Sequence, residues 1–318
     1  MLTVLVTCPP MLCMLDDFTA YALEKNMCLV KADVLQTLTE DELIALLPNF
    51  DGWIIGDDPA TKQVLTAGKK GKLKACVKWG IGVDNVDFKA CQALKIPITN
   101  TPMMFGREVS DVALAYVIGL SRQLHVVDRD IRLNNTWPKP AGISLAGKRI
   151  GVLGFGDIGS HLVKRLLACD MTVTVYDPYA VSLQQENVQF ASWPDQISAL
   201  DFLVFTCSLN EKNHHMLNAD ILNHCKDGLY VVNVARGPLI HEPSLIKALQ
   251  SGKVKAAALD VFEAEPLPAH SLLRSFPQCI FGSHNGSNTQ DAVRRASHDA
   301  INKLSQFFVT LEEPCLCQ

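Results

Sequence analysis

Polar residues follow several short hydrophobic runs in the second half of this chain, and their types could support chemistry. Arg236 follows LYVVNVA, Asp260 follows AAAL, and His284 follows CIFGS. The runs resemble strands of an open parallel sheet, in which ligands bind outside the carboxyl ends of the strands. We therefore expect these side chains to share one site.

Three of the ionisable residues in this region could together assist hydride transfer. His284 can exchange a proton with a substrate hydroxyl or carbonyl, because histidine titrates near neutral pH. Glu265 can bond the other ring nitrogen and stabilise the imidazolium. Arg236 offers a planar fork suited to a substrate carboxylate and its neighbouring carbonyl. The alternatives are a helix-capping or salt-bridging Arg236, a surface Glu265 beside Glu263, and a structural His284.

A glycine motif, G-x-G-x-x-G, stands between a strand and an amphipathic helix in GVLGFGDIGSHLVKRLL. Gly154 would allow a tight turn, Gly156 would let a pyrophosphate approach the backbone, and Gly159 would let the helix pack on the strand. Asp177 ends the next strand, where its carboxylate can bind ribose hydroxyls and would repel a 2′-phosphate. The motif therefore predicts NAD rather than NADP, with a turn-capping Asp177 before Pro178 as the alternative.

The elements that must position these residues alternate between short β-branched runs and helical patterns, which is typical of parallel α/β folds. Thr39 and Glu42 are spaced as a helix capping box, and a long helix is expected from about Val109 to Val127. We predict an α/β fold of two doubly wound parallel-sheet domains. A Rossmann NAD-binding domain, residues 101–287, is inserted in a flavodoxin-like substrate domain made of residues 1–100 and the C-terminal helix 288–318.

Composition excludes several classes of function. The formal net charge of −4 leaves no basic surplus for a nucleic acid. No apolar run reaches the roughly 18 to 20 residues of a membrane span, and we expect a cytoplasmic protein. The 11 cysteines are scattered through apolar segments, which indicates reduced thiols. Neither Cys315 and Cys317 in the CLCQ tail, which we expect to be exposed, nor the pair His214-His215 predicts a metal site.

The segments VNVARGPLI, ALDVFEAEP and SHNGS, in this order after GFGDIG, resemble the D-isomer-specific 2-hydroxyacid dehydrogenase family. The similarity extends upstream through VKWGIGVDNVDFKA and PITNTP, and is greatest to phosphoglycerate-dehydrogenase-like members, here without room for a C-terminal regulatory domain. The resemblance implies that Arg236, Glu265 and His284 are catalytic. It also implies NAD contacts from Phe155, Asp157, Ile158, Cys207, Ser208, Ala235, Asp260 and Gly286.

The resemblance further implies that a loop of the first domain binds the substrate carboxylate through backbone amides. This loop reads Lys78, Trp79, Gly80, Ile81, Gly82. Lys78 stands where phosphoglycerate-oxidising relatives commonly have arginine, and Asp57 and Asp58 count against a phosphate if they face the ligand.

We expect NAD-dependent interconversion of a small D-2-hydroxy acid and its 2-oxo acid, with 3-phosphoglycerate as one candidate. Reduction of glyoxylate or hydroxypyruvate is the alternative within the enzyme class. An NAD-sensing protein similar to transcriptional corepressors is a further alternative, which the complete catalytic trio disfavours. The apolar helix beginning near Val109 exceeds what a surface brace needs. Because the corresponding helix packs between subunits in this family, the resemblance implies a homodimer.

Overall fold

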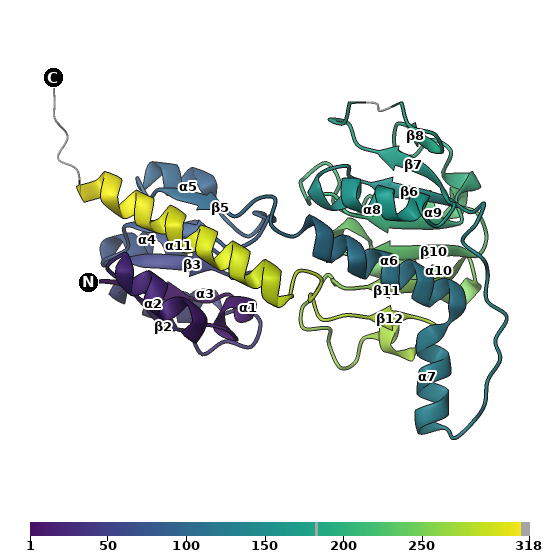
Figure 1. Ribbon diagram of the computed structural model, residues 1–318, viewed down its shortest axis with the longest axis horizontal. Helices are drawn as coiled ribbons and strands as arrows, with labels where there is room; N and C mark the ends of the chain where they lie inside the picture. Colours follow the sequence, from purple (N-terminus) through teal and green to yellow (C-terminus); the bar gives the residue numbers. More distant parts are fainter. Residues whose placement is uncertain (182–183, 313–318) are drawn as a thin grey trace. The chain divides into compact units, whose positions relative to one another are not determined.

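A computed structural model describes residues 1–181 and 184–312 of the chain, which form two compact units. Unit 1 comprises Met1–Met104 together with the C-terminal segment from Asn288, and unit 2 comprises Phe105–Ser287. Figure 1 shows this arrangement, with the last helix, in yellow, lying among the elements of unit 1. Cys315 and Cys317 lie outside the described residues.

Unit 1 contains a five-stranded parallel sheet with the order β2-β1-β3-β4-β5. Its strands are β1 (Leu2–Val6), β2 (Met27–Lys31), β3 (Gly52–Ile55), β4 (Ala75–Lys78) and β5 (Ile98–Asn100). Its helices are α1 (Pro9–Leu12), α2 (Asp16–Glu24), α3 (Glu40–Leu46), the 3-10 turn η1 (Leu47–Asn49), α4 (Lys62–Lys70), α5 (Phe88–Ala93) and α11 (Gln290–Glu312). The topological switch point lies between β1 and β3, where this strand order places a ligand site.

Local sequence explains how unit 1 is assembled. The predicted capping box is confirmed, since Thr39 and Glu42 exchange hydrogen bonds at the start of α3. Helix α11 packs against β4 and α2. Gly52 allows this helix to approach the sheet, because a Cβ there would lie 2.8 Å from the ring of Phe308. The C-terminal helix is therefore part of the core of unit 1.

Unit 2 contains a seven-stranded parallel sheet with the order β12-β11-β10-β9-β6-β7-β8. Its strands are β6 (Arg149–Leu153), β7 (Thr172–Tyr176), β8 (Val188–Phe190), β9 (Phe202–Phe205), β10 (Leu229–Asn233), β11 (Val254–Leu259) and β12 (Ile280–Phe281). Its helices and 3-10 turns are α6 (Gly106–Arg122), α7 (Leu124–Leu133), α8 (Asp157–Leu167), η2 (Ile197–Ala199), α9 (Ala219–His224), η3 (Gly237–Leu239), α10 (Glu242–Ser251) and η4 (Leu272–Ser275).

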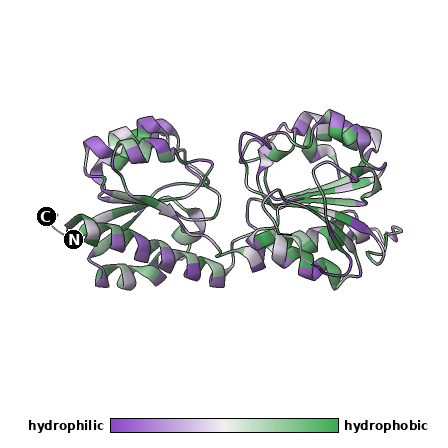
Figure 2. Ribbon diagram, turned by 90° about the horizontal axis from the view of Figure 1, so that it is seen from above, coloured by the Kyte–Doolittle hydropathy of each residue, from purple (hydrophilic) through white to green (hydrophobic). Residues whose placement is uncertain are grey.

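Helices cover both faces of the sheet in each unit, and the strands between them are largely hydrophobic (Figure 2). In unit 2, α6 packs with α8, and α9 packs with α10. The prediction of two doubly wound parallel sheets is confirmed. No helix within residues 1–181 and 184–312 combines the length and hydrophobicity needed to cross a membrane.

The prediction of one long helix from Val109 to Val127 is wrong in one respect, because the structure has two helices there. Gln123 adopts a left-handed conformation with φ of 52°, which ends α6 and begins α7 in a new direction. Two contacts hold α7 in that direction: His125 Nε2 lies 3.0 Å from the Gln278 carbonyl oxygen, and Arg129 donates to the Pro277 carbonyl oxygen at 3.0 Å. Hydrophobic periodicity continues across the break and could not reveal it.

Candidate active site

The residues of the predicted catalytic trio follow three strands that are neighbours in the sheet of unit 2. Arg236 follows β10, Glu265 lies in the loop after β11, and His284 follows β12. Since these strands are parallel, their carboxyl ends share one edge. The sheet topology thus gathers three sequence segments at that edge.

His284 and Glu265 form a direct pair. The Nδ1 atom of His284 lies 2.8 Å from Oε2 of Glu265, and the two side chains are 22% and 21% exposed. The other carboxylate oxygen of Glu265 accepts a hydrogen bond from the Phe262 amide at 2.9 Å. The His284 amide donates to the Asp260 carbonyl oxygen at 2.7 Å. The contact at Nδ1 therefore fixes the orientation of the His284 ring.

Arg236 lies on the turn immediately before η3, in extended backbone geometry. Its Nη1 donates to the Ala235 carbonyl oxygen at 2.9 Å. Asn233 holds the turn, since its amide group donates to the Arg236 carbonyl oxygen and accepts from the Ala235 amide. At Gly237 a Cβ would lie 1.9 Å from the Phe262 carbonyl carbon. Only glycine lets the turn that carries Arg236 lie directly against the loop that carries Glu265.

The glycine motif forms a cradle that fits a dinucleotide pyrophosphate. Gly154 has φ of +94°, and a Cβ there would lie 2.7 Å from the backbone of Cys207. At Gly159 a Cβ would meet the Gly154 oxygen at 2.0 Å, whereas at Gly156 it would meet no protein atom within 4 Å. Gly156 also precedes α8 without a side-chain cap. Open space over a glycine at the amino end of a helix is what a bound phosphate requires.

Asp177 lies at the end of β7, where it is tied to the glycine turn. Its Oδ2 accepts a hydrogen bond from the Phe155 amide at 2.7 Å, and its Oδ1 accepts one from the Tyr179 amide at 2.8 Å. The ring of Phe155 meets that of Phe190 edge to face at 5.4 Å between centroids. These contacts hold the Asp177 carboxylate beside the cradle. Asp177 therefore caps the turn, and this role is compatible with a contact to a ligand.

Two other predicted cofactor residues carry carboxylates enclosed by protein. That of Asp260 is hydrogen-bonded, whereas Oδ2 of Asp157 is buried with no hydrogen-bond partner among the described residues. Asp260 is buried, and it accepts hydrogen bonds from the Tyr116 hydroxyl at 3.2 Å and from the Gly286 amide at 2.8 Å. Burial and the neighbouring Asp260 raise the pKa of Tyr116. The carboxylate of Asp157 lies against Gly106, where a Cβ would be 2.2 Å from Oδ1. The sequence carried no signal for the Tyr116 contact, because Tyr116 lies on a distant helix.

The remaining predicted cofactor residues line the same edge of the sheet. Burial, with the nearby Asp177, raises the pKa of the Cys207 thiol to about 12, so this thiol stays protonated at neutral pH. The Ser208 carbonyl oxygen accepts a hydrogen bond from Asn213 at 2.7 Å. Ala235 is buried, and Ile158 is half-buried in the first turn of α8.

The loop of unit 1 with predicted substrate contacts follows β4. Lys78 is 3% exposed, and its Nζ bonds Asp57 Oδ1 at 3.1 Å and the Trp79 carbonyl oxygen at 3.0 Å. The indole of Trp79 is buried and donates to the Ser297 hydroxyl of α11 at 3.1 Å. The charge of Lys78 is therefore paired within unit 1.

The backbone of the same loop is held by side chains at the end of β5. Gly80, with φ of +128°, donates its amide to the Thr101 hydroxyl at 2.8 Å. The side-chain amide of Asn100 donates to the carbonyl oxygens of Gly80 and Ile81 at 3.3 and 3.2 Å. Close backbone turns of this kind favour glycine.

Asp58 is fully buried, so it does not face a ligand. It accepts hydrogen bonds from the Leu38 amide at 2.8 Å, from the Gly56 amide at 3.2 Å, and from the Thr7 hydroxyl. Burial raises the pKa of Asp58. Of these two acids, only Asp57 reaches the surface, with its side chain 34% exposed.

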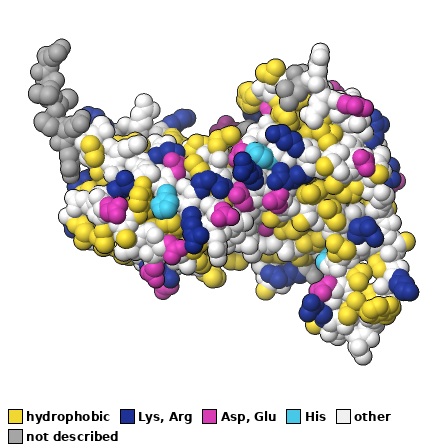
Figure 3. All heavy atoms as spheres, viewed as in Figure 1, with side chains coloured by type: hydrophobic (Ala, Val, Ile, Leu, Met, Phe, Trp, Pro, Cys, Tyr) yellow, Lys and Arg dark blue, Asp and Glu magenta, His cyan; other side chains and the backbone are white. Residues whose placement is uncertain are grey.

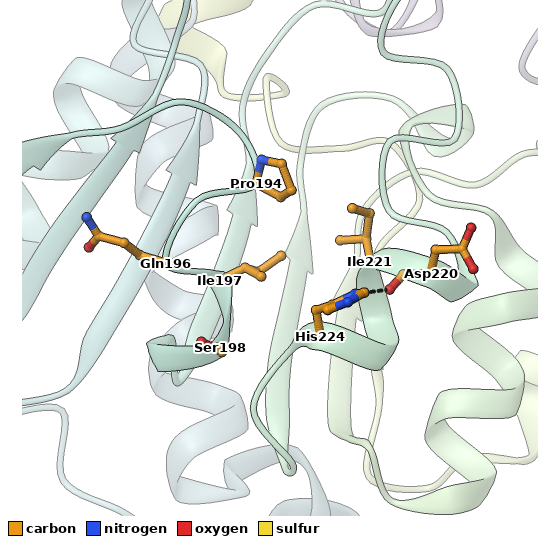
Figure 4. A pocket seen from close by; sticks show the side chains of 7 residues that line it. All are labelled: Pro194, Gln196, Ile197, Ser198, Asp220, Ile221 and His224. Carbon is orange, nitrogen blue, oxygen red and sulfur yellow. Dashed lines mark hydrogen bonds between the residues drawn. The ribbon is translucent and has the colours of Figure 1, made fainter.

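A pocket of about 380 Å³ opens elsewhere in unit 2, between η2 and α9. Figure 4 shows its lining, in which His224 bonds the Asp220 carbonyl oxygen at 2.7 Å. It includes no predicted site residue, and it is separate from the edge that carries the trio. Among the described residues, no three His, Cys, Asp or Glu side chains are grouped so as to bind a metal.

Comparison with known proteins gives one consistent result. The family model described as D-isomer specific 2-hydroxyacid dehydrogenase, NAD binding domain, matches residues 114–286. The chain is 33% identical over 274 residues to a hydroxypyruvate reductase of Thermotoga maritima, covering 84% of this chain and 88% of that protein. It is 32% identical over 269 residues to a D-3-phosphoglycerate dehydrogenase of Mycobacterium bovis, covering 83% of this chain and 50% of that protein, so the match spans half of that relative.

A solved structure, the TT0316 protein of Thermus thermophilus, is similar with a TM-score of 0.84 at 25% identity, covering 97% of each chain. Together with the glycine cradle, these matches define an NAD-dependent oxidoreductase. The chain belongs to the D-isomer specific 2-hydroxyacid dehydrogenase family.

Proposed function

We propose that this enzyme interconverts a small D-2-hydroxy acid and its 2-oxo acid, with Arg236, Glu265 and His284 as its catalytic residues. The observation that carries the proposal is the 2.8 Å contact of His284 with Glu265 at the edge where Arg236 also lies. A histidine fixed by a carboxylate beside an arginine suits a substrate that carries a carboxylate next to a carbonyl.

NAD, when bound, supplies or accepts the hydride. In the reductive direction the protonated His284 donates a proton from Nε2 to the carbonyl oxygen of the substrate. Glu265 stabilises the imidazolium through Nδ1 and keeps the ring in one orientation. Arg236 binds the substrate carboxylate and polarises the carbonyl. In the oxidative direction neutral His284 accepts the hydroxyl proton.

We assign NAD binding to the cradle of Gly154, Gly156 and Gly159 and to the amides at the start of α8. Asp177 is proposed to bind the ribose hydroxyls, and its negative charge disfavours the 2′-phosphate of NADP. Contacts are further proposed for Phe155, Asp157, Ile158, Cys207, Ser208, Ala235, Asp260 and Gly286.

We propose that the loop from Lys78 to Ile81 helps to determine which acid is accepted, and that an unphosphorylated acid is preferred. An unpaired cation in this loop would favour a phosphorylated acid, whereas Lys78 is buried and paired with Asp57. The similarity to a hydroxypyruvate reductase along most of both chains supports glyoxylate or hydroxypyruvate. 3-Phosphoglycerate is the second candidate, favoured by the relative named D-3-phosphoglycerate dehydrogenase.

A steady-state screen tests the proposed reaction and its substrate. Purified enzyme is assayed with NADH against glyoxylate, hydroxypyruvate, pyruvate and 3-phosphohydroxypyruvate, and with NAD against the D-2-hydroxy acids, including 3-phosphoglycerate. The largest kcat/KM is expected for hydroxypyruvate or glyoxylate. A larger kcat/KM for the phosphorylated pair would reject the preference, and no turnover of any acid would reject the reaction.

We also propose that the enzyme is a homodimer formed through α7. No residue of α7 is buried, although Leu124, Ile131 and Leu133 are large and apolar. Figure 3 shows hydrophobic side chains gathered at the end of unit 2 where Figure 1 places α7. Leu124 and Ile131, seven positions apart, share one face of the helix, and exposed apolar side chains gathered in this way are typical of an interface. Light scattering should show a dimer. Ile131→Glu should dissociate it, whereas Leu35→Glu, at an exposed leucine of unit 1, should not. A monomeric wild type would contradict the proposal.

A further inference from the structure

A cluster of histidines and glutamates in unit 2 lies beside the catalytic trio, and the proposed mechanism does not use it. It consists of His214, His215, His241, Glu242 and Glu263. The ring of His215 contacts those of both His214 and His241, with centroid distances of 3.8 and 4.8 Å. His241 Nδ1 lies 2.6 Å from the Ser244 hydroxyl. We call this group the histidine cluster.

His215 connects the two turns that carry Arg236 and Glu265. Its backbone amide donates to the Pro238 carbonyl oxygen at 2.7 Å, two residues after Arg236. Its Nε2 lies 2.8 Å from Oε1 of Glu263, two residues before Glu265. One residue therefore contacts both turns, at its backbone on one side and at its ring on the other.

Glu263 is also held by the first turn of α10. The Glu242 amide donates to Glu263 Oε1 at 3.1 Å, and the Glu263 amide donates to Glu242 Oε1 at 2.7 Å. These reciprocal bonds fix the loop in the same way as a capping box fixes a helix. The loop bearing Glu265 is thus anchored at Glu263 by one helix and one imidazole.

The charges in this arrangement explain why an imidazole is useful here. Burial raises the pKa of Glu242. The hydrogen bond from the Glu263 amide lowers this pKa, whereas the negative charges of Glu263 and Glu265 raise it, and the net direction is upward. His215 Nε2 lies 2.8 Å from Glu263 Oε1, where the ring can donate a hydrogen bond that stabilises the Glu263 carboxylate beside these acids. The other titratable groups facing His215 within the cluster are His214 and His241.

The backbone of His215 gives a second, independent indication. Its φ of 52° lies in the left-handed region. For a residue other than glycine this conformation is uncommon, and it persists where the surrounding contacts hold it. Here the conformation directs the amide to Pro238 and the ring to Glu263 at once.

We propose that His215 is a positioning residue for the dehydrogenase reaction, which sets the placement of Glu265, and through it of His284, by way of Glu263. This inference rests on the proposed function of the trio. His215 touches neither substrate nor cofactor in this role. Its loss lowers the rate of the chemical step while leaving NADH binding intact.

The test compares His215→Asn with His215→Gln, using His214→Asn as the matched control. Asparagine tolerates the left-handed backbone but is too short to bond Glu263, whereas the glutamine amide can reach it. We expect kcat to fall about tenfold in His215→Asn, since a hydrogen bond to a charged group contributes on that order. KM for NADH should stay within about twofold. His215→Gln should recover part of kcat, and His214→Asn should resemble the wild type.

Two further readouts separate positioning from a merely structural role. The fall in kcat of His215→Asn should occur without a matching rise in the Kd for NADH, because His215 touches no cofactor in this role. The NMR signal of the His284 Nδ1 proton, measured without substrate, should broaden in His215→Asn and persist in His214→Asn. Equal kcat and an equal NMR signal in the two asparagine variants would overturn the proposal. A wild type that turns over no 2-oxo acid yet loses this signal in His215→Asn would instead reject the proposed function.

Discussion

Replacing Glu265 by glutamine tests the pair at the centre of the site. Glutamine is nearly isosteric, and its amide oxygen can still accept the hydrogen bond from the Phe262 amide. It removes the negative charge that lies 2.8 Å from His284. The substitution therefore changes the stabilisation of the imidazolium with little change in shape.

The size of the effect follows from the geometry of this pair. A hydrogen bond to a charged group contributes about 1.5–3 kcal/mol. The two side chains are 22% and 21% exposed, so solvent screening places the value near the lower half of that range, about 2 kcal/mol. If the pair acts in the transition state, kcat for reduction should fall roughly 30-fold.

The assay is the steady-state oxidation of NADH by hydroxypyruvate across a range of pH. Glu265 favours protonated His284, so its loss should move the alkaline decline of reductase activity to lower pH. KM for NADH should change little. Glu211→Gln, at an exposed glutamate of the same unit, is the control and should behave as the wild type. A Glu265→Gln enzyme with kcat within about twofold of wild type and an unshifted profile would refute the reasoning.

Gly156→Ala should leave the stability of the cofactor-free protein within about 0.5 kcal/mol, because its Cβ meets no protein atom, yet raise the Kd for NADH about tenfold; unchanged affinity by fluorescence titration would count against the cradle. Asp177→Ser should raise the ratio of NADPH to NADH kcat/KM by about tenfold or more, and an unchanged ratio would reject the ribose assignment. Burial favours a higher pKa for Asp51, but hydrogen bonds from Thr3 and the ion pair with Lys74 outweigh it and lower that pKa. Asp51→Asn should therefore lower the free energy of unfolding by about 1 kcal/mol. The whole difference should be present above the ordinary carboxyl pKa of about 3.9 and should shrink as the pH falls below it. Urea titrations that give the same difference at pH 3 would contradict this.

Residues at strand ends were the most predictable part of the molecule. Parallel strands place their carboxyl ends on one edge, so the residue after each hydrophobic run in the sequence already identifies a candidate for the site. The pairing of His284 with Glu265 and the position of Asp177 at the end of β7 follow this rule. The capping box at Thr39 was equally predictable, because its signal is local.

The other contacts depend on residues that are distant in sequence and carry no joint pattern. Lys78 contacts Asp57 only because β3 and β4 are neighbours in the sheet. The sequence suggested that the Lys78 ammonium group could bind a ligand, whereas in the structure it is paired with a carboxylate. Gln123 ends α6 through a left-handed backbone conformation, which the spacing of hydrophobic residues does not reveal. His215 was visible as a polar residue in a connecting segment, but its link to Glu263 requires the fold.

The most direct test of the central claim is the kcat/KM of His284→Ala for reduction of the best 2-oxo acid, measured together with NADH affinity. Proton transfer by a positioned side chain contributes about 10²–10⁴-fold, so kcat/KM should fall by that factor while the Kd for NADH stays within about threefold. Near-normal turnover in His284→Ala would contradict the assignment of His284 as the residue that exchanges the substrate proton.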